Sequence, residues 1–372
     1  MNKPAIDIGL ISQSTSFDAL TADRTWVNQA VSLIQADSHR SADTHLIKLN
    51  LSAFPGIDFY LKDESTHVTG SLKHRLARSL FLYGICNGNI HEGTTIVEAS
   101  SGSTAISEAY FARLLGLPFI AVVPEGTSSE KLNSIRHYGG TIAFAESSLL
   151  YEEAERLANV HNGHYMDQFT FAERVTDWRG NNNIAESLFE QMALETHPIP
   201  AWVVVGAGTG GTSATIGRFI RYKAQHYGSS RLCVADPEGS VFYDVFNAKQ
   251  TGAEPASATK SNIEGVGRPR HEPSFNPHVV DLMFKVKDEA SIATALWLES
   301  LLNRKFGGST GLNVYAAIQL AQDMHSKGEQ GSIVTLICDD GARYRDTVHN
   351  SAWRSDLGLN VEPIIEMLNT LR

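Results

Sequence analysis

Apolar residues recur along the chain in two alternating patterns, one helical and one strand-like. In residues 25–36 they fall three or four positions apart, as on one face of a helix, and this spacing returns at residues 104–115, 130–138, 149–161, 212–226 and 291–305. Short apolar runs lie between these segments, at residues 59–61, 94–98, 117–123, 141–144, 202–205, 232–235 and 333–338. Strands that alternate with helices over short connections predict an α/β protein with parallel sheets covered by helices on both faces. Residues 249–262 are rich in Ala, Thr, Ser and Gly and predict a surface loop.

A further helical stripe begins at Lys73 and stops near Gly84. Its apolar face carries Leu72, Leu76 and Leu80, extended by Ala77 and Phe81. Lys73 lies at helical spacing before Ala77 and Phe81, so the pattern predicts that its side chain points inward with them. The face predicted to meet water carries His74, Arg75 and Arg78.

An inward lysine usually has a partner or a chemical task, because burial disfavours its charged form and lowers its pKa. A lysine with a lowered pKa can form a Schiff base with a carbonyl compound. The alternative is a lysine at a helix end whose long stem lets the charge reach water. This segment by itself leaves both interpretations open.

Length, composition and charge narrow the class of protein. A chain of 372 residues is expected to form two domains or subdomains, and 42% apolar with 19% charged residues is typical of a globular protein. A formal charge of −10 argues against a general binder of nucleic acid or anionic membranes. The three cysteines have no paired spacing that predicts a disulfide framework or a zinc site. Residues 1–7 do not begin a signal peptide, and no run of about 18 apolar residues predicts a membrane span. We therefore expect a cytoplasmic protein.

Ligands of open α/β sheets bind beyond the carboxyl ends of the strands, so the turns that follow strands are the candidate sites. The first such turn follows Glu98 and contains Ser100, Ser101, Gly102, Ser103 and Thr104. Its hydroxyls and the amides of the following helix could bind a carboxylate or a phosphate. The alternative is that the serines only cap that helix.

The second turn is glycine-rich and contains Gly206, Gly208, Thr209, Gly210, Gly211 and Thr212. Glycines let the backbone approach an anion closely, and the helix N-terminus supplies oriented donors, so this turn predicts a phosphate site. The spacing Gly206-x-Gly208-x-x-Gly211, with Asp236 at the end of the next strand, also fits a nicotinamide dinucleotide site.

The third turn carries two carboxylates, Asp339 and Asp340, directly after the strand that ends with Cys338. They could cap a helix, or one could pair with a cationic group of a cofactor. The histidines show no metal-ligand spacing, and we expect no metal site.

Taken together, five ordered segments resemble the fold-type II pyridoxal-phosphate enzymes, specifically the cysteine synthase and cystathionine β-synthase family. The segments are residues 69–75, 100–104, 208–212, 236–240 and 264–267, and the resemblance covers about residues 45–350. It implies a tryptophan synthase β-like fold of two three-layer αβα domains with pyridoxal 5'-phosphate between them. It also accounts for Asp236 without a nicotinamide cofactor.

The resemblance implies a role for each predicted site residue. Lys73 would form the Schiff base and act as the catalytic residue, and the phosphate would lie on Gly208, Thr209, Gly210, Gly211 and Thr212. Ser100, Ser101, Gly102, Thr104 and Gly265 would bind the substrate. Ser103 would stand near the cofactor ring, where the family commonly has asparagine, and Asp340 would face the ring nitrogen, where the family has serine. His74 replaces the usual aspartate after the lysine.

Among subgroups, the chain most resembles a bacterial L-cysteine desulfhydrase branch. This implies β-elimination of L-cysteine to sulfide, pyruvate and ammonia, with a small amino acid as the substrate and a homodimer as the expected assembly. The alternatives are a cysteine synthase, which adds sulfide after the same first steps, and a catalytically weak relative that acts as a binding partner. The resemblance further implies a large domain of residues 1–60 and 165–372 and a smaller domain of residues 61–164.

Overall fold

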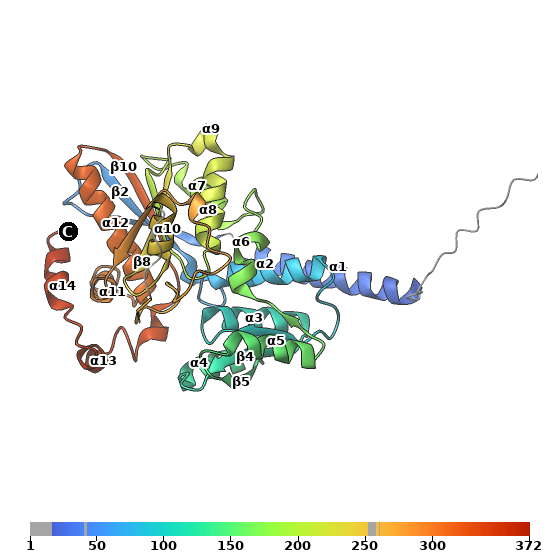
Figure 1. The fold of residues 1–372 in the computed structure, drawn as a ribbon. Coiled ribbons are helices and arrows are strands. Elements are labelled where there is room, and N and C mark those ends of the chain that lie inside the picture. Colours follow the sequence, from blue (N-terminus) through green and yellow to red (C-terminus); the bar gives the residue numbers. More distant parts are fainter. Residues whose placement is uncertain (1–16, 41–42, 252–257, 260) are drawn as a thin grey trace, which may run out of the picture.

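The computed structural model describes residues 17–40, 43–251, 258–259 and 261–372, arranged around two sheets (Figure 1). Residues 1–7, considered above for a signal peptide, lie outside the described part. We call the larger sheet with its helices the larger lobe, and the smaller sheet with its helices the smaller lobe. In the part of the chain that is described, no helix is both long and apolar enough to cross a membrane.

The larger lobe is built on a six-stranded sheet. Its strands, in spatial order, are β1 (His45–Leu49), β2 (Ile57–Asp63), β10 (Gly331–Ile337), β7 (Trp202–Gly206), β8 (Arg231–Pro237) and β9 (Leu282–Val286). Neighbours from β2 to β9 pair in parallel, whereas β1 pairs antiparallel with β2 at one edge. The predicted parallel sheet is therefore confirmed, and the antiparallel edge strand is an addition to it.

Helices cover both faces of this sheet. The helices of the larger lobe are α7 (Ile184–Met192), α8 (Gly211–Tyr222), α9 (Ala224–Tyr227), α10 (Phe242–Thr251), α11 (Asp288–Leu302), α12 (Gly308–Ser326), α13 (Ser351–Asp356) and α14 (Glu362–Asn369). Alternate strand residues enter two different cores: Val204 packs with α11 and α12, while Val203 and Val205 pack with α7 and α8. This alternation is the reason why the strands read as continuous apolar runs.

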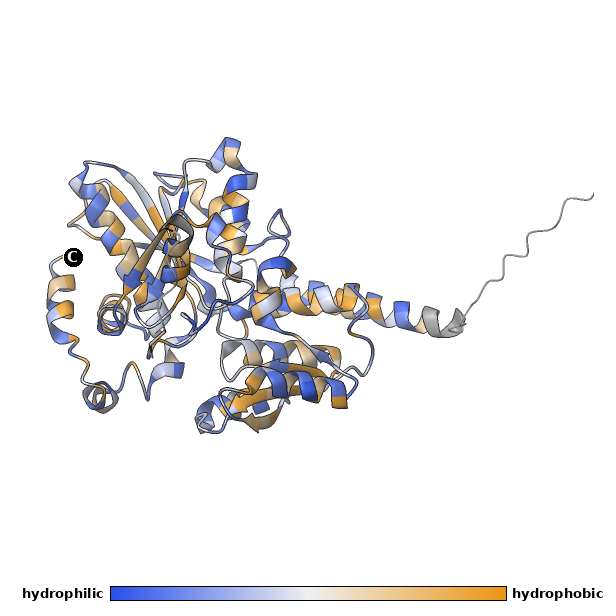
Figure 2. Cartoon of the chain, viewed as in Figure 1, coloured by the Kyte–Doolittle hydropathy of each residue, from blue (hydrophilic) through white to orange (hydrophobic). Residues whose placement is uncertain are grey.

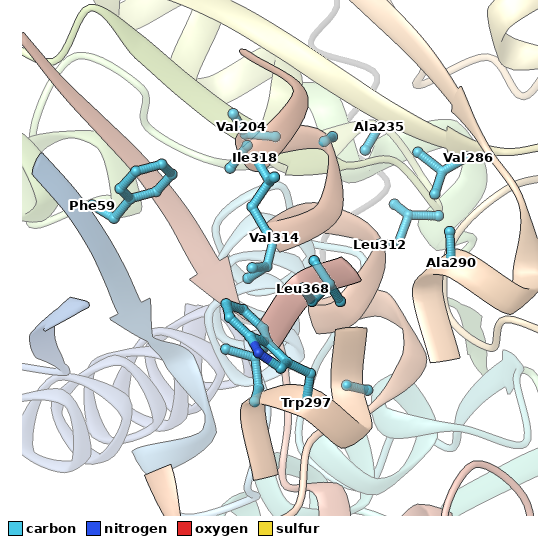
Figure 3. Packing of buried hydrophobic residues seen from close by; sticks show 14 of the residues in the cluster. Phe59, Val204, Ala235, Val286, Ala290, Trp297, Leu312, Val314, Ile318 and Leu368 are labelled. Carbon is cyan, nitrogen blue, oxygen red and sulfur yellow. The ribbon is translucent and has the colours of Figure 1, made fainter. Parts of the chain in front are cut away.

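Trp297 of α11 lies at the centre of one core (Figure 3). Helices α11 and α12 pack against each other and against α14 and the sheet, so residues on most of their circumference are buried. Figure 2 shows hydrophobic positions, in orange, mixed with hydrophilic positions, in blue, along the helices around the two sheets. A helix buried on nearly all sides has no strong amphipathic pattern, and its apolar content follows from its location.

The smaller lobe has a parallel sheet of four strands, β5 (Thr141–Ala145), β4 (Phe119–Pro124), β3 (Ile96–Ala99) and β6 (His164–Tyr165). Helices α2 (Lys73–Cys86), α3 (Ser103–Leu115) and α4 (Ser129–His137) lie on one face, and α5 (Leu150–Val160) lies on the other. Helix α6 (Gln168–Val175) leads back toward the larger lobe. His164 of β6 pairs with Ile96 of β3 in this sheet.

Helix α1 (Phe17–His39) extends from the body of the molecule (Figure 1) and packs on α2 and α3 through Ala30 and Ile34. It therefore belongs with the smaller lobe by contact, although residues 1–60 were assigned to the larger domain. The boundaries at residues 60 and 164 remain predictions. The predicted loop at residues 249–262 begins too early, because α10 continues to Thr251; residues 252–257 and 260 lie outside the described part.

The polar face of α2 is largely covered by neighbouring segments, which corrects the expectation that His74, Arg75 and Arg78 meet water. His74 is buried 3.5 Å from Asp37 of α1, measured between Nε2 and Oδ2. Arg75 lies 2.7 Å from the fully buried Glu64, measured between Nε and Oε2, and Arg78 donates to Ser38 of α1. Burial alone would raise the pKa of Glu64, but Arg75 holds it well below its usual range. The ion pair with Glu64 and the polar contacts with Asp37 and Ser38 of α1 thus cover this helix face.

Candidate active site

A cavity of about 560 Å³ lies between the lobes, where the carboxyl ends of β3, β7 and β10 meet. Predicted site residues from the first two turns line it together with Lys73 and Gly265, and the third turn lines it through Asp339; the predicted residues in the lining are Lys73, Ser100, Ser101, Gly102, Ser103, Thr104, Gly208, Thr209, Gly210, Thr212 and Gly265. Two predicted site residues, Gly211 and Asp340, do not line this cavity. The three turns selected from the sequence therefore do converge on one space.

Lys73 is the first residue of α2, and backbone pairing with the end of β10 fixes its position. Leu72 N donates to Cys338 O at 2.9 Å, and Asp340 N donates to Gly70 O at 3.0 Å. Gly70 has a φ of +66°, a left-handed conformation that favours glycine, so the turn before Lys73 depends on this residue. The start of α2 is thereby attached to the strand end that forms the cavity floor.

The Lys73 amine lies in surroundings that disfavour its charged form. Burial lowers its pKa, and the nearby Arg268 guanidinium lowers it further, while Cys338 and Asp339 act in the opposite direction. The side chain still keeps partial exposure because it lines the cavity. An amine that gives up its proton readily and faces a cavity can act as a nucleophile or as a general base.

The glycine turn after β7 lies so close to its neighbours that side chains would not fit. A Cβ added to Gly208 would lie 2.2 Å from Gly265 O, and one added to Gly210 would lie 2.6 Å from Phe275 Cα. Gly210 also has a φ of +88°. Helix α8 begins at Gly211, directly after these glycines. The free backbone amides at its N-terminus therefore lie at the end of the helix that borders the cavity. This is the geometry of an anion cradle.

The serine-rich turn after β3 leads into α3. The residue before this helix is Gly102, which has no side chain to cap it, so the turn is not merely a side-chain cap. Behind it, Thr104 Oγ1 donates to Gln168 Oε1 at 2.7 Å, and Gln168 N donates to Glu98 Oε2 at 3.2 Å. These bonds tie the turn to the start of α6, while the serine hydroxyls face the cavity lining.

Two fully buried carboxyl groups, Glu98 of β3 and Glu108 of α3, lie beneath this turn. Burial raises the pKa of Glu98 to about 8. Burial, together with the neighbouring Glu98, also raises the pKa of Glu108. Neither carboxyl oxygen of Glu108 has a hydrogen-bond partner among the described residues. The pair therefore keeps protons at pH values where exposed glutamates are ionised.

The side chains of Asp339 and Asp340, which follow β10, point in different directions. Asp340 is exposed and accepts a hydrogen bond from Ala342 N at 2.9 Å, which caps a short 3₁₀ helix, η3 (Gly341–Tyr344). Asp339 lines the cavity and accepts from Tyr344 Oη at 2.6 Å and from Ser103 Oγ at 3.4 Å. Its other oxygen, Oδ1, is buried without a partner among the described residues. The expectation that Asp340 enters the site is thus corrected: Asp339 does so.

Sequence reasoning missed several residues of the lining, including Gln168, Tyr151, Arg268 and Arg343. Arg268 follows the turn that begins at Glu264, and Arg343 lies in η3, where its Nη1 donates to Ser103 Oγ at 2.7 Å. None of these residues follows a periodic apolar pattern, although Gln168 and Arg343 lie only a few residues beyond the ends of β6 and β10. The signal available for Arg268 was its position directly after a recognised glycine turn.

The structure does not support a nicotinamide dinucleotide site, because Asp236, the acid expected to bind the ribose, does not line the cavity. Asp236 is buried in β8, outside the cavity lining, and accepts from Tyr243 N at 2.8 Å at the start of α10. Burial raises its pKa to about 7. Across the described residues, no three His, Cys, Asp or Glu side chains group closely enough to hold a metal ion.

The lining suits pyridoxal phosphate in three respects. A glycine turn that admits no Cβ lines the cavity at the start of α8, an amine with a lowered pKa faces the same cavity, and Asp339 Oδ1 is a buried acceptor without a donor among the described residues. A phosphate, an aldehyde and a ring nitrogen are the groups of that cofactor that these features would bind.

Comparisons with known proteins agree with this geometry. A sequence model of the family described as "Pyridoxal-phosphate dependent enzyme" matches residues 38–339. The chain is 56% identical to L-cysteine desulfhydrase Cds1 of Mycobacterium tuberculosis over 342 residues, 91% of this chain and 92% of that protein. It is 27% identical to a cysteine synthase of Dictyostelium discoideum over 87% of this chain and 86% of the relative.

The crystal structure of O-ureido-L-serine synthase has the same fold, with a TM-score of 0.71 at 24% identity over 82% of this chain and 91% of that one. The predicted α/β architecture of two three-layer lobes is thereby confirmed. The family match spans both lobes and the first two turns that line the cavity, and it ends at Asp339 in the third. The chain belongs to the family of pyridoxal-phosphate dependent enzymes.

Proposed function

We propose that this protein is a pyridoxal-phosphate dependent L-cysteine desulfhydrase, a carbon–sulfur lyase. It would convert L-cysteine and water to pyruvate, ammonia and hydrogen sulfide. The observation that carries the proposal is the single cavity in which the Lys73 amine, the glycine cradle and the serine-rich turn meet. The 56% identity to a protein named L-cysteine desulfhydrase, over nine-tenths of both chains, favours this reaction within the family.

Each part of the cavity has a task in this proposal. The cofactor, when bound, withdraws electrons from the substrate Cα and so makes its proton removable. The amides around Gly208 and Gly210 hold the phosphate, and Lys73 removes the Cα proton as a general base. The turn containing Ser100, Ser101, Gly102 and Thr104 binds the substrate carboxylate, with Gly265 across the cavity from it.

We propose Asp339, in place of Asp340, as the acid that faces the ring nitrogen. Asp339 lines the cavity, its Oδ2 accepts from Tyr344, and its buried Oδ1 has no donor among the described residues, so the carboxyl group has acceptor capacity left for a ring N–H. A carboxylate beside that nitrogen favours the protonated ring, which withdraws electrons more strongly than the neutral ring. Ser103, bonded to both Asp339 and Arg343, would orient the ring from the opposite lobe.

A cysteine synthase is the second candidate, favoured by relatives such as the Dictyostelium protein at 27% identity. It shares the first half of the reaction and differs in adding sulfide or another thiol before product release. A catalytically weak binding partner is the third, and the retention of Lys73 in the cavity counts against it. We further propose a homodimer in the cytoplasm as the working state.

Purified protein supplied with L-cysteine alone distinguishes these candidates. We expect sulfide and pyruvate in equal amounts, together with a visible absorption band of the bound cofactor that disappears in Lys73→Ala. Cysteine formation from O-acetylserine and sulfide, without pyruvate from L-cysteine, would instead identify a synthase. Protein that shows no visible band after addition of pyridoxal phosphate would overturn both enzyme proposals.

A further inference from the structure

Arg268 projects into the cavity from a turn that is firmly attached to the larger lobe. Gly267, with a φ of +72°, donates its amide to Ala207 O at 2.7 Å, next to the glycine cradle. The amide of Arg268 donates to Ser240 Oγ at 3.0 Å. The backbone of Arg268 is therefore fixed on both sides, and its side chain lines the cavity with Lys73.

Contacts from three directions orient the guanidinium. Its Nε donates to Glu272 Oε1 at 3.0 Å, its plane lies over the Phe169 ring with 4.1 Å to the centroid, and Nη2 donates to Tyr151 Oη of the smaller lobe. Burial raises the pKa of Tyr151 to about 12, so this phenol stays neutral and does not cancel the arginine charge. A stacked and doubly bonded guanidinium is pre-organised, so little freedom is lost when it binds another group.

The carboxylates around Arg268 do not neutralise its charge. The fully buried Glu272 is shared with a second arginine, Arg270, at 3.3 Å, which leaves one positive charge on the cluster of three residues. Lys131, another cation in the lining, lies 2.6 Å from Glu264 and is paired. Arg268 also contributes to the lowered pKa of Lys73, so its charge is felt at the reacting amine.

We propose that Arg268 binds the sulfur of the substrate and stabilises the hydrosulfide as it departs, an inference that rests on the proposed desulfhydrase activity. In this step the Cβ–S bond breaks and its electron pair leaves with sulfur as HS⁻, while Lys73 holds the proton taken from Cα. A pre-organised cation that lines the cavity stabilises such a developing anion. The site would therefore select β-substituents that leave as basic anions.

Arg268→Gln tests this with two substrates that differ only in the leaving group, L-cysteine and β-chloro-L-alanine. Chloride is a far weaker base than hydrosulfide and depends less on a cation. We expect kcat for L-cysteine to fall about 10²-fold, and kcat for β-chloro-L-alanine to change much less. Arg268→Lys, which keeps the charge, should recover part of the loss. An equal fall for both substrates, or no fall for either, would overturn the inference.

A spectroscopic titration separates sulfur binding from other roles of the arginine. L-Alanine has the same carboxylate and no leaving group, so its Kd, read from the visible band of the holoenzyme, should be unchanged in Arg268→Gln. A large rise in that Kd would show that Arg268 binds the carboxylate and would overturn the proposal. Arg268→Met, which keeps an unbranched stem over Phe169, replaces Arg268→Gln if that variant fails to fold.

Arg231→Gln is the matched control, because the Arg231 guanidinium also stacks on an aromatic ring, 4.2 Å from the centroid of Trp202, yet does not line the cavity. Its ratio of cysteine to chloroalanine turnover should equal that of the wild type. The same shift in this ratio for both arginine variants would overturn the proposal. Wild-type protein that releases pyruvate from β-chloro-L-alanine but not from L-cysteine would instead refute the desulfhydrase function itself.

Discussion

At the scale of single residues, the proposed chemistry of the cavity depends on side chains whose pKa values differ from those of the same groups in water. Lys73 has a lowered pKa because of burial first and Arg268 second, while Glu98 and Glu108, beneath the substrate turn, have raised ones. Both kinds of shift favour the neutral form, which is the form that burial tolerates. The site thus combines an amine prepared to accept a proton with acids that retain theirs.

The buried acid pair predicts a specific dependence of stability on pH. An unfolded glutamate loses its proton near pH 4.5, whereas the pKa of folded Glu98 is raised to about 8. Between these values the folded state holds more protons, so the free energy of unfolding falls as pH rises, by at most about 1.4 kcal/mol per pH unit for each proton. Glu108→Gln removes one of these acids, so its stability relative to the wild type should rise from pH 5 to pH 8, as urea unfolding can measure.

An exposed glutamate provides the control for this prediction. Glu366→Gln, on the surface of α14, should keep a constant difference from the wild type across the same pH range. A constant difference for Glu108→Gln as well would mean that the buried pair titrates like exposed acids. Comparing variants with the wild type at each pH cancels the titration of the other carboxylates, such as Glu64.

At the scale of elements, the periods of apolar residues predicted the strands and helices that carry the site. The turns after β3, β7 and β10 could be selected because parallel strands deliver their carboxyl ends to one edge. The choice between Asp339 and Asp340 could not be made in this way. It depends on the residue at which η3 begins after β10. Asp340 is the residue before η3, has an extended backbone, and accepts a hydrogen bond from Ala342 N with its side chain.

That choice yields a paired prediction. Asp339→Asn should shift the visible band of the bound cofactor and slow pyruvate formation by about 10²-fold, because the neutral amide no longer favours a protonated ring. Asp340→Asn should leave the band and the rate unchanged and cost at most about 1 kcal/mol of unfolding free energy through the weakened cap. Absorption spectra and pyruvate assays on both variants suffice, and the opposite pattern would return the role to Asp340.

At the scale of the whole molecule, the two lobes could be expected from chain length and from strand–helix alternation, but their contacts could not. The charged face of α2 looked solvent-exposed because a single helix pattern cannot reveal that α1 covers it with Asp37 and Ser38. Arg268 was missed for a related reason, since residues of distant segments meet only after both lobes have formed. The spacing of apolar residues predicts that a helix face is buried, without identifying the element that covers it. Burial of a charged face can be predicted only when the residues that pair with the charges are known.

The ion pair between Lys131 of α4 and Glu264 of the larger lobe joins the lobes at the cavity, with Nζ–Oε2 at 2.6 Å and 31% and 38% exposure of the side chains. Exposed pairs stabilise folding by less than about 1 kcal/mol, so Lys131→Gln should scarcely change the free energy of unfolding. If the pair stabilises the closed arrangement of the two lobes by about 1 kcal/mol, its loss lowers the population of closed molecules about fivefold. Lys131→Gln should therefore raise KM for L-cysteine by a similar factor. Lys327→Gln, which breaks a 2.7 Å pair with Asp323 at the C-terminal end of α12, is the control and should leave KM unchanged. Equal KM values for both variants would show that the lobes close without help from this pair.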